Sequence, residues 1–317
     1  KNVLFDWKDS FDSVVLHPNT KNDLNAFPGS KPKFVHRLKP EIDNFLSLGF
    51  EQYKDLVGEF DLAVVILPRQ KELARHLIFC ANKLAPKGCI MIDGANNSGI
   101  GGILRELSEI THTKGLLSKA HGKLIWLDSC DNLDCWDRSS FLKVKGGFST
   151  KVGVFSADGA DPASVRLGDI LAQNLKGNIA DLGAGWGYLT KRALENPLVR
   201  SVDSVEYDSG ALECAKKNCD DHRVSFHWQD AINWCPKKKF DAIIMNPPFH
   251  SGNSINFDLR RAFVVAAARL LKKNGSLWVV SSRHSSFEKL LSSIFRETIE
   301  IVKEKPYSVF KANYPIK

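Results

Sequence analysis

The sequence predicts an α/β fold made of two tandem copies of one parallel-sheet unit. Short apolar runs alternate with stretches of helical periodicity along most of the 317 residues, which is the pattern of strands joined by helices. Two strand signals also recur, because the run 60–68 resembles 240–248 and the run 84–92 resembles 271–279. The helical stretch 71–84 joins the first pair of signals. We therefore infer a duplicated unit.

The composition favours a polyanionic partner and a cytoplasmic location. The chain carries 44 Lys and Arg against 36 Asp and Glu, a formal net charge of +8 at pH 7. The longest uninterrupted apolar run, 262–268, is too short to span a bilayer, and the start shows no signal-peptide pattern. The seven cysteines form no CxxC pair and are odd in number, so we expect reduced thiols and no metal site.

A glycine-rich loop follows a short apolar strand that contains Asp181. Glycines stand at alternate positions, Gly183, Gly185 and Gly187, and a helical pattern follows. Glycine is needed where the backbone has a positive φ or where a ligand touches the main chain. The dinucleotide pattern has its third glycine where Tyr188 stands, and the Gly-Lys-Ser/Thr of the phosphate loop is absent. The loop therefore matches neither of those sites.

Acidic residues stand at the ends of the next two predicted strands. The strand 200–206 ends on Glu206, about 20 residues beyond the loop, where an acid commonly takes ribose hydroxyls. The helical stretch 208–218 separates it from the strand 224–230, which ends on Asp230. Open parallel sheets bind ligands at the carboxyl edge of their strands. Each acid alone could be a solvated strand end, but their order along the chain favours one site.

The fourth strand, 240–245, leads into Asn246-Pro247-Pro248-Phe249. Two consecutive prolines stiffen this turn and remove two N–H donors, so acceptors dominate it. A planar substrate with an –NH2 group fits such a turn: the Asn246 side-chain oxygen and the Pro247 carbonyl accept from the amine, and Phe249 stacks on the plane. Asn-Pro is also common in ordinary strand-end turns. The glycine loop upstream favours the interpretation as a binding site over that of an ordinary turn.

The pattern from Asp181 to Gly187 resembles motif I of the Rossmann-like class of S-adenosylmethionine-dependent methyltransferases. A helical stretch, 257–271, and a fifth strand, 276–280, complete the alternation that this class requires. The resemblance implies one S-adenosylmethionine, and it implies that the acid ending the third strand contacts the adenine amine. The cofactor-binding residues that it implies are Asp181, Gly183, Gly185, Gly187, Glu206, Asp230, Ala231 and Asn246.

A narrower resemblance is to the bacterial ribosomal RNA guanine-N2 methyltransferases of the RsmC and RlmG group. It rests on the motif 246–250 and on two further segments, 153–159 and 306–312. Members of this group often carry Cys where Ala184 stands and more often Asp where Glu206 stands. Both differences keep the chemistry.

The resemblance implies methyl transfer from S-adenosylmethionine to the exocyclic N2 of a guanine in ribosomal RNA, with the small-subunit RNA preferred. The expected partner is this RNA or the small ribosomal subunit, and no membrane or metal. The expected catalytic residues are Asn246, Pro247, Pro248 and Phe249, whereas His250 is not expected to act as a base.

Two other function classes stay open. Adenine-N6 and protein glutamine methyltransferases use the same turn but more often have Tyr or Trp at position 249. The chain could also be a non-enzymatic RNA-binding assembly factor that keeps an inactive fold. The intact set of Asp181, Gly183, Gly185, Glu206 and Asn246 argues against that alternative.

We expect two tandem Rossmann-like methyltransferase domains, of which the N-terminal one is degenerate. Nothing before Phe60 resembles the glycine loop, and Ile66 or Leu67 replaces the catalytic Asn. The group that the chain resembles likewise pairs an inactive N-terminal copy with an active C-terminal one. The predicted boundaries are 1–145 for the degenerate domain and 146–317 for the catalytic domain.

Three further segments carry expectations. The glycine-rich stretch 96–102 follows the fifth-strand position and is expected to be a loop, and 139–153 is expected to be the linker. The basic stretch 31–39 has Phe34 and His36 interleaved, which suits phosphate contact and base stacking. A solvated loop is the alternative for it. The degenerate domain is thus expected to bind RNA or to stabilise its neighbour.

Overall fold

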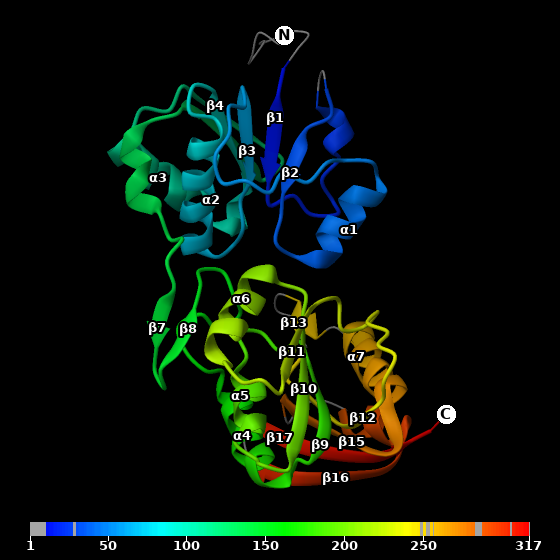
Figure 1. Cartoon of the computed structure of the whole chain (residues 1–317). Helices are drawn as coiled ribbons and strands as arrows, with labels where there is room; N and C mark the ends of the chain where they lie inside the picture. The colour runs from blue at the N-terminus through cyan, green and yellow to red at the C-terminus, as the bar shows by residue number, and fades with distance from the viewer. Residues whose placement is uncertain are drawn as a thin grey trace. The chain divides into compact units, whose positions relative to one another are not determined.

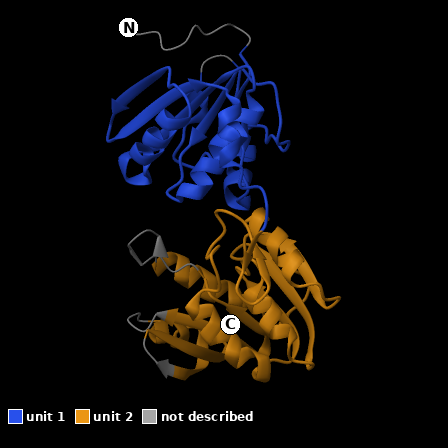
Figure 2. Cartoon of the chain, turned by 90° about the vertical axis from the view of Figure 1, so that its left-hand side faces the viewer, with its two compact units in different colours: residues 1–141 blue, residues 142–317 orange. Residues whose placement is uncertain are grey.

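The chain folds into two α/β units, shown in Figure 1 and coloured separately in Figure 2. One unit comprises residues 1–141 and the other residues 142–317. The computed structural model describes residues 11–27, 30–247, 250–251, 254–255, 257–282, 287–304 and 306–316. We describe each unit by itself.

The second unit is built on a mixed sheet with the strand order β11-β10-β9-β12-β15-β17-β16. Strands β11 to β15 in this order pair in parallel, and β17 runs antiparallel to β15 and β16. The bounds are β9 Gly177–Leu182, β10 Val199–Glu206, β11 Val224–Trp228, β12 Phe240–Met245, β15 Leu271–Ser282, β16 Phe295–Glu304 and β17 Tyr307–Pro315. Each strand predicted from the sequence is present.

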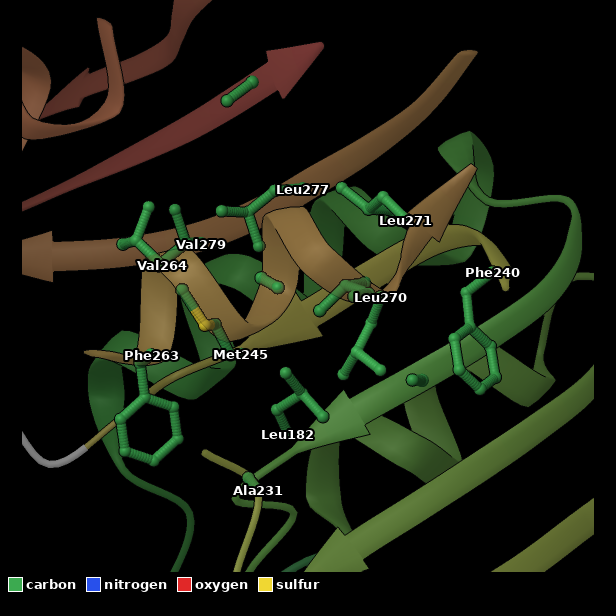
Figure 3. Close-up of a cluster of buried hydrophobic side chains, with 14 of the residues drawn as sticks. Leu182, Ala231, Phe240, Met245, Phe263, Val264, Leu270, Leu271, Leu277 and Val279 are labelled. Atoms are coloured by element: carbon green, nitrogen blue, oxygen red, sulfur yellow. The ribbon is translucent and has the colours of Figure 1, made fainter. Parts of the chain in front are cut away.

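Helices cover both faces of this sheet (Figure 1). Strand side chains alternate between faces, so Leu182 and Met245 face one cluster while Ile179 and Ile244 face the other. The first cluster includes α7 and α8 and is shown in Figure 3, and the second includes α4 and α5. Because both faces are buried, the central strands read as continuous apolar runs. The helix bounds are α4 Pro162–Asn174, α5 Tyr188–Leu194, α6 Ser209–Asn218, α7 Phe257–Leu270 and α8 Phe287–Ser292, and β13 His250–Ser251 pairs with β14 Ser254–Ile255.

The first unit repeats this topology in shortened form. Its strand order, β2-β1-β3-β4-β6-β5, is the order of the second unit without the strand that corresponds to β11. Strands β3 and β4 hold the places of β12 and β15, as the repeated strand signals predicted, so the predicted fold class is confirmed. The bounds are β1 Ser13–Leu16, β2 Lys33–Val35, β3 Leu62–Ile66, β4 Cys89–Ala95, β5 Gly115–Lys119, β6 Gly122–Asp128, α1 Lys39–Ser47, α2 Lys71–Leu84 and α3 Ile100–Ile110, with short 3-10 turns at Leu24–Ala26, Asn96–Ser98 and Asp131–Trp136.

The expectation that Phe34 and His36 in the basic stretch 31–39 stack on bases is wrong, whereas phosphate contact by its Lys and Arg side chains stays a prediction. Phe34 is fully buried in β2, and the His36 ring stacks on His17 with 5.0 Å between ring centroids. Burial lowers the pKa of His36 to about 3, so this ring is neutral near pH 7. The ammonium groups of Lys31 and Lys33 lie over aromatic rings of their own unit. The aromatic residues of this stretch thus serve the core.

The segment predicted as a linker contains a β hairpin that belongs to the second unit. Strands β7, Leu142–Val144, and β8, Phe148–Thr150, pair antiparallel around Gly146 and Gly147, which both have positive φ. The buried amide of Asn218 on α6 fixes β8: its Oδ1 accepts from Ser149 N at 2.7 Å, and its Nδ2 donates to Ser149 O at 2.8 Å. The segment thus leads into the second domain, as expected, but as a paired hairpin and not only as a linker.

The glycine-rich stretch 96–102 forms a 3-10 turn that continues into α3. It is not a plain loop, although Gly99 does adopt a positive φ of 86° at the junction. Throughout the described ranges of the chain, no helix is both long enough and apolar enough to cross a bilayer.

Candidate active site

The glycine loop connects β9 to α5 and leaves its backbone open. Gly183, Gly185 and Gly187 have φ values of 74°, 57° and 90°, which glycine alone adopts without strain. A Cβ at Gly187 would lie 3.0 Å from the sulfur of Cys219, so this glycine permits close packing on the neighbouring chain. A Cβ at Gly185 would meet no atom within 4 Å beyond its neighbours in the chain. The main chain at Gly183 and Gly185 is therefore accessible to a ligand.

Asp181 is a fully buried carboxylate on β9 beneath this loop. Its Oδ2 accepts a hydrogen bond from Thr190 Oγ1 at 2.7 Å, whereas Oδ1 has no hydrogen-bond partner among the described residues. Burial raises the pKa of Asp181 to about 7. An unpartnered buried carboxylate oxygen is costly unless a ligand satisfies it. A nearby positive charge would stabilise the ionised form of Asp181, although Asp181 is fully buried and is not among the described residues that line the cavity below.

Glu206 at the end of β10 closes against the same loop. Its Oε2 accepts from Gly185 N at 2.7 Å, and its Oε1 accepts from Asp208 N at 2.9 Å. Burial raises the pKa of Glu206 to about 7. A ribose hydroxyl that donates to Glu206 would share or replace the hydrogen bond from the loop. Since each carboxylate oxygen can accept a second hydrogen bond, the contact with the loop does not exclude the predicted ribose contact.

Asp230 and Ala231 follow β11 and form a turn. The carboxylate of Asp230 accepts from Ile232 N at 3.0 Å and from Asn233 Nδ2 at 2.6 Å, and Ala231 is buried. These hydrogen bonds assign Asp230 a role in capping the turn. Neither residue is among the described residues that line the cavity below.

A cavity lies where the carboxyl ends of β9 and β12 meet. This is the point at which the strand order of the sheet reverses, where open α/β sheets bind ligands. The structure brings Gly183, Gly185 and Asn246 together here. The lining residues are Phe155, Ser156, Asp161, Ser164, Gly183, Ala184, Gly185, Trp186, Tyr188, Leu189 and Asn246.

The side chain of Asn246 is held by two residues that the sequence analysis missed. Its Nδ2 donates to Asp161 Oδ2 at 2.7 Å and to Ser164 Oγ at 2.8 Å. Asp161 is the N-cap of α4, where its Oδ2 also accepts from Ser164 N at 3.1 Å. An Asp-Pro step at the start of a helical pattern is a sequence signal for such a cap, but it does not predict the contact with Asn246.

The rest of the catalytic turn is described only in part. Pro247 is buried. Pro248 and Phe249 lie outside the described residues, as does the side chain of His250. Their expected roles therefore stay predictions.

Trp186 connects the glycine loop to the segment 153–159. Its indole Nε1 donates to Phe155 O at 3.1 Å and to Ser156 O at 3.3 Å. Ser156 has a positive φ of 53°, and the Phe155 side chain is 63% exposed at the rim of the cavity. Trp186 is itself buried, so it both fills the core and fixes this wall of the cavity.

These donors and acceptors suit a nucleoside ligand with a cationic group, since they combine an open backbone with buried carboxylates. In the described part of the chain, no group of three or more His, Cys, Asp or Glu residues is placed to hold a metal ion.

Comparison with known proteins identifies related sequences. The family model described as the methyltransferase small domain matches residues 145–311, which is more than half of the chain. The ribosomal RNA small subunit methyltransferase C of Shewanella sediminis is 26% identical over 285 residues, covering 86% of this chain and 82% of the relative. Its counterpart in Buchnera aphidicola subsp. Schizaphis graminum is 26% identical over 268 residues, covering 82% and 79%.

A solved structure shares the fold of the whole chain. It is the 16S rRNA N2 methyltransferase RsmC of T. thermophilus in complex with AdoMet and guanosine. The TM-score is 0.82 at 21% sequence identity, and the match covers 98% of this chain and 90% of the other. The two-unit architecture is therefore shared along nearly the entire length.

Proposed function

This chain belongs to the methyltransferase small domain family, and we propose that it transfers a methyl group from S-adenosylmethionine to N2 of a guanine in 16S ribosomal RNA. The observation that carries the proposal is the amide of Asn246, held beside the open glycine loop with its nitrogen end occupied. We further propose that the protein acts in the cytoplasm on this RNA or on the small subunit.

The described residues fit S-adenosylmethionine. Gly183 and Gly185 offer accessible backbone, while Asp181 and Glu206 offer carboxylates whose ionised forms a cation stabilises. The cofactor supplies an electrophilic methyl group on a sulfonium. The roles of Asp230 and Ala231 toward the adenine remain part of the proposal.

The acceptors of the turn account for the reactivity of the amine. The N2 lone pair of guanine is delocalised into the ring, so the nitrogen is a poor nucleophile. Asn246 Oδ1 and the Pro247 carbonyl would accept the two amine hydrogens and favour a more tetrahedral nitrogen. As the nitrogen attacks, it becomes positive, and acceptors aimed at it stabilise that charge. Alignment by the turn, with Phe249 stacked on the base, supplies much of the remainder.

No strong base is required for this reaction. The methylated nitrogen carries a positive charge and is acidic, so it can lose its proton after transfer. We therefore assign no base to His250.

The first unit has a supporting role in this proposal. His17, at a φ of 59°, and Pro18 follow β1, where the second unit has glycines. The first unit therefore lacks the open loop that would hold a second cofactor. We propose that it binds RNA or stabilises the second unit.

Mass spectrometry of nuclease-digested 16S rRNA tests the proposed reaction. We expect cells that lack the protein to lose one N2-methylguanosine and to regain it when the protein is restored. Loss of an N6-methyladenosine, or of a methylated protein glutamine, would instead establish one of the two alternative substrates. Unchanged RNA and protein would favour the assembly-factor alternative.

Cofactor affinity should rise as the pH increases through 7. The pKa of Asp181 is raised to about 7, so this acid is partly protonated there. A cationic ligand binds the ionised carboxylate better, so binding lowers this pKa and releases protons. Calorimetry between pH 6 and pH 8, in buffers of different ionisation enthalpy, measures both effects.

The variant Asp181→Asn provides the control for this pH dependence. Asparagine cannot ionise, so the variant lacks the proton that Asp181 releases on binding. Proton release should therefore shrink in the variant. Equal proton release by both proteins would assign the pH dependence to another group, with Glu206 as the first candidate.

A further inference from the structure

We propose that Asp161 is a positioning residue that sets which end of the Asn246 amide faces the cavity. This inference rests on the proposed function, since it explains how Asn246 presents an acceptor to an amine. Asp161 lies 85 positions before Asn246 in the sequence and reaches it only through the packing of α4.

The two contacts of Asn246 are chemically different from each other. Ser164 Oγ can donate or accept, so it would tolerate either end of an amide. An ionised carboxylate only accepts, so Asp161 Oδ2 can face the Asn246 nitrogen but not its oxygen. Turning the amide over would place two acceptors 2.7 Å apart. Asp161 therefore selects the orientation, and Ser164 supports it.

Both hydrogens of Asn246 Nδ2 are used in this arrangement, one toward each partner. Oδ1 accepts no hydrogen bond from any residue that the structure describes. The same side chain lines the cavity. The acceptor is thus left for a ligand, while both donors are occupied by Asp161 and Ser164, which line the same cavity. An amide in the other orientation would present donors to an amine, which also donates.

Asp161 is held in place independently of Asn246. It is the N-cap of α4, and Pro162 at the next position starts the helix without a spare N–H. Its Oδ2 accepts from Ser164 N at 3.1 Å as part of this cap. The carboxylate is therefore oriented before any substrate arrives, which is the condition for preorganised catalysis.

The variant Asp161→Ser tests the proposal. Serine is also a good N-cap, so the helix start is kept. Its hydroxyl can both donate and accept, so it tolerates either end of the Asn246 amide and the selection is lost. We expect the single-turnover rate of methyl transfer to fall about tenfold or more, with cofactor affinity and melting temperature nearly unchanged. Asp169→Ser is the matched control: it makes the same change on α4 at a 58% exposed side chain and should leave the rate unaltered.

A double-mutant cycle separates positioning from a merely structural role. If Asp161 acts through Asn246, adding Asp161→Ser to Asn246→Ala should cause no further loss of rate. A full additional loss in that background, or a wild-type rate for Asp161→Ser alone, would overturn the proposal.

A readout without activity keeps the inference apart from the proposed function. In protein labelled with 15N-asparagine, the side-chain signal of Asn246 is assigned by its absence in Asn246→Ala. Its two amide protons should exchange with solvent slowly, and about tenfold faster or more in Asp161→Ser. Equal exchange rates in both proteins would refute the orientation even if the wild type methylates guanine. Absence of guanine methylation by the wild type, with the exchange difference present, would refute only the proposed function.

Discussion

Replacing Asn246 with alanine is expected to lower the rate of methyl transfer about a hundredfold or more. The variant loses the acceptor that stabilises positive charge on the amine in the transition state, and such preorganised groups contribute 10²–10³ in rate in other enzymes (roughly, by analogy). Single-turnover transfer to 16S rRNA from radiolabelled S-adenosylmethionine measures this loss. Cofactor affinity should change far less, because an interaction made mainly in the transition state affects the chemical step.

Asn174→Ala is the control for this experiment. Asn174 ends the same helix that carries Asp161, and its side chain only donates to Ile170 O within that helix. It should methylate at the rate of the wild type. A wild-type rate for Asn246→Ala would remove the catalytic assignment. His250→Ala should cost much less than Asn246→Ala, and an equal loss would show that a base acts there.

Replacing Gly185 with valine is expected to weaken cofactor binding about a hundredfold. Valine is disfavoured at a φ of 57°, and its side chain would cover backbone that the cofactor needs. The Gly185 N–H also donates to Glu206. A distorted backbone at position 185 would therefore disturb both the glycine loop and the carboxylate of Glu206. Titration calorimetry on the full chain should give one S-adenosylmethionine per wild-type chain and a dissociation constant about a hundredfold higher for the variant.

Gly99→Val is the matched control, because it also places valine at a positive φ but lies outside the candidate site. Gly99 has a φ of 86° at the start of α3 in the first unit, and a Cβ there would likewise meet no atom within 4 Å. Its cofactor affinity should remain normal. A stoichiometry of two, or equal loss of binding in both variants, would contradict the assignment of the cofactor to the second unit alone.

The fold could be predicted because its signals are local and repeated. Strands buried on both faces produce continuous apolar runs, and β12 has the bounds that the run 240–245 predicted. The helix α2 likewise spans the predicted stretch 71–84, since its apolar residues recur at helical spacing. Repetition of these two signals identified the N-terminal unit as a copy of the same fold, although that unit lacks the functional residues.

Two features were missed because a local pattern was read for function before structure. In β2, Phe34 is buried while its neighbours Lys33 and Val35 are half-buried, which is the alternation of an ordinary strand. The aromatic ring of Phe34 therefore belongs to the core. Before the second sheet, Gly146-Gly147 between two short β-rich runs is a hairpin signal, which the expected linker overlooked. In both cases the local sequence pattern predicted a strand or a hairpin.

The site could be predicted only where one motif carries it. The glycine loop and Asn246 each stand in a recognisable local pattern, and both line the cavity. Asp161 and Ser164 contact Asn246 across more than 80 positions of sequence. Such a contact depends on how α4 packs on the sheet, and no local periodicity encodes it. The same holds for Trp186, whose partners are backbone carbonyls of a distant segment.

The hydrogen bonds of Asn218 determine where the second unit can be separated from the first. Its Nδ2 donates to Trp186 O at 2.8 Å as well as to β8, so the hairpin is tied to the glycine loop. Cutting the chain after residue 145 would remove β7, strip β8 of its pairing strand and leave unpaired backbone groups next to that loop. A truncated protein that begins at Leu142 keeps the pair together, and it is the shorter chain to choose for crystals or NMR of the second unit alone.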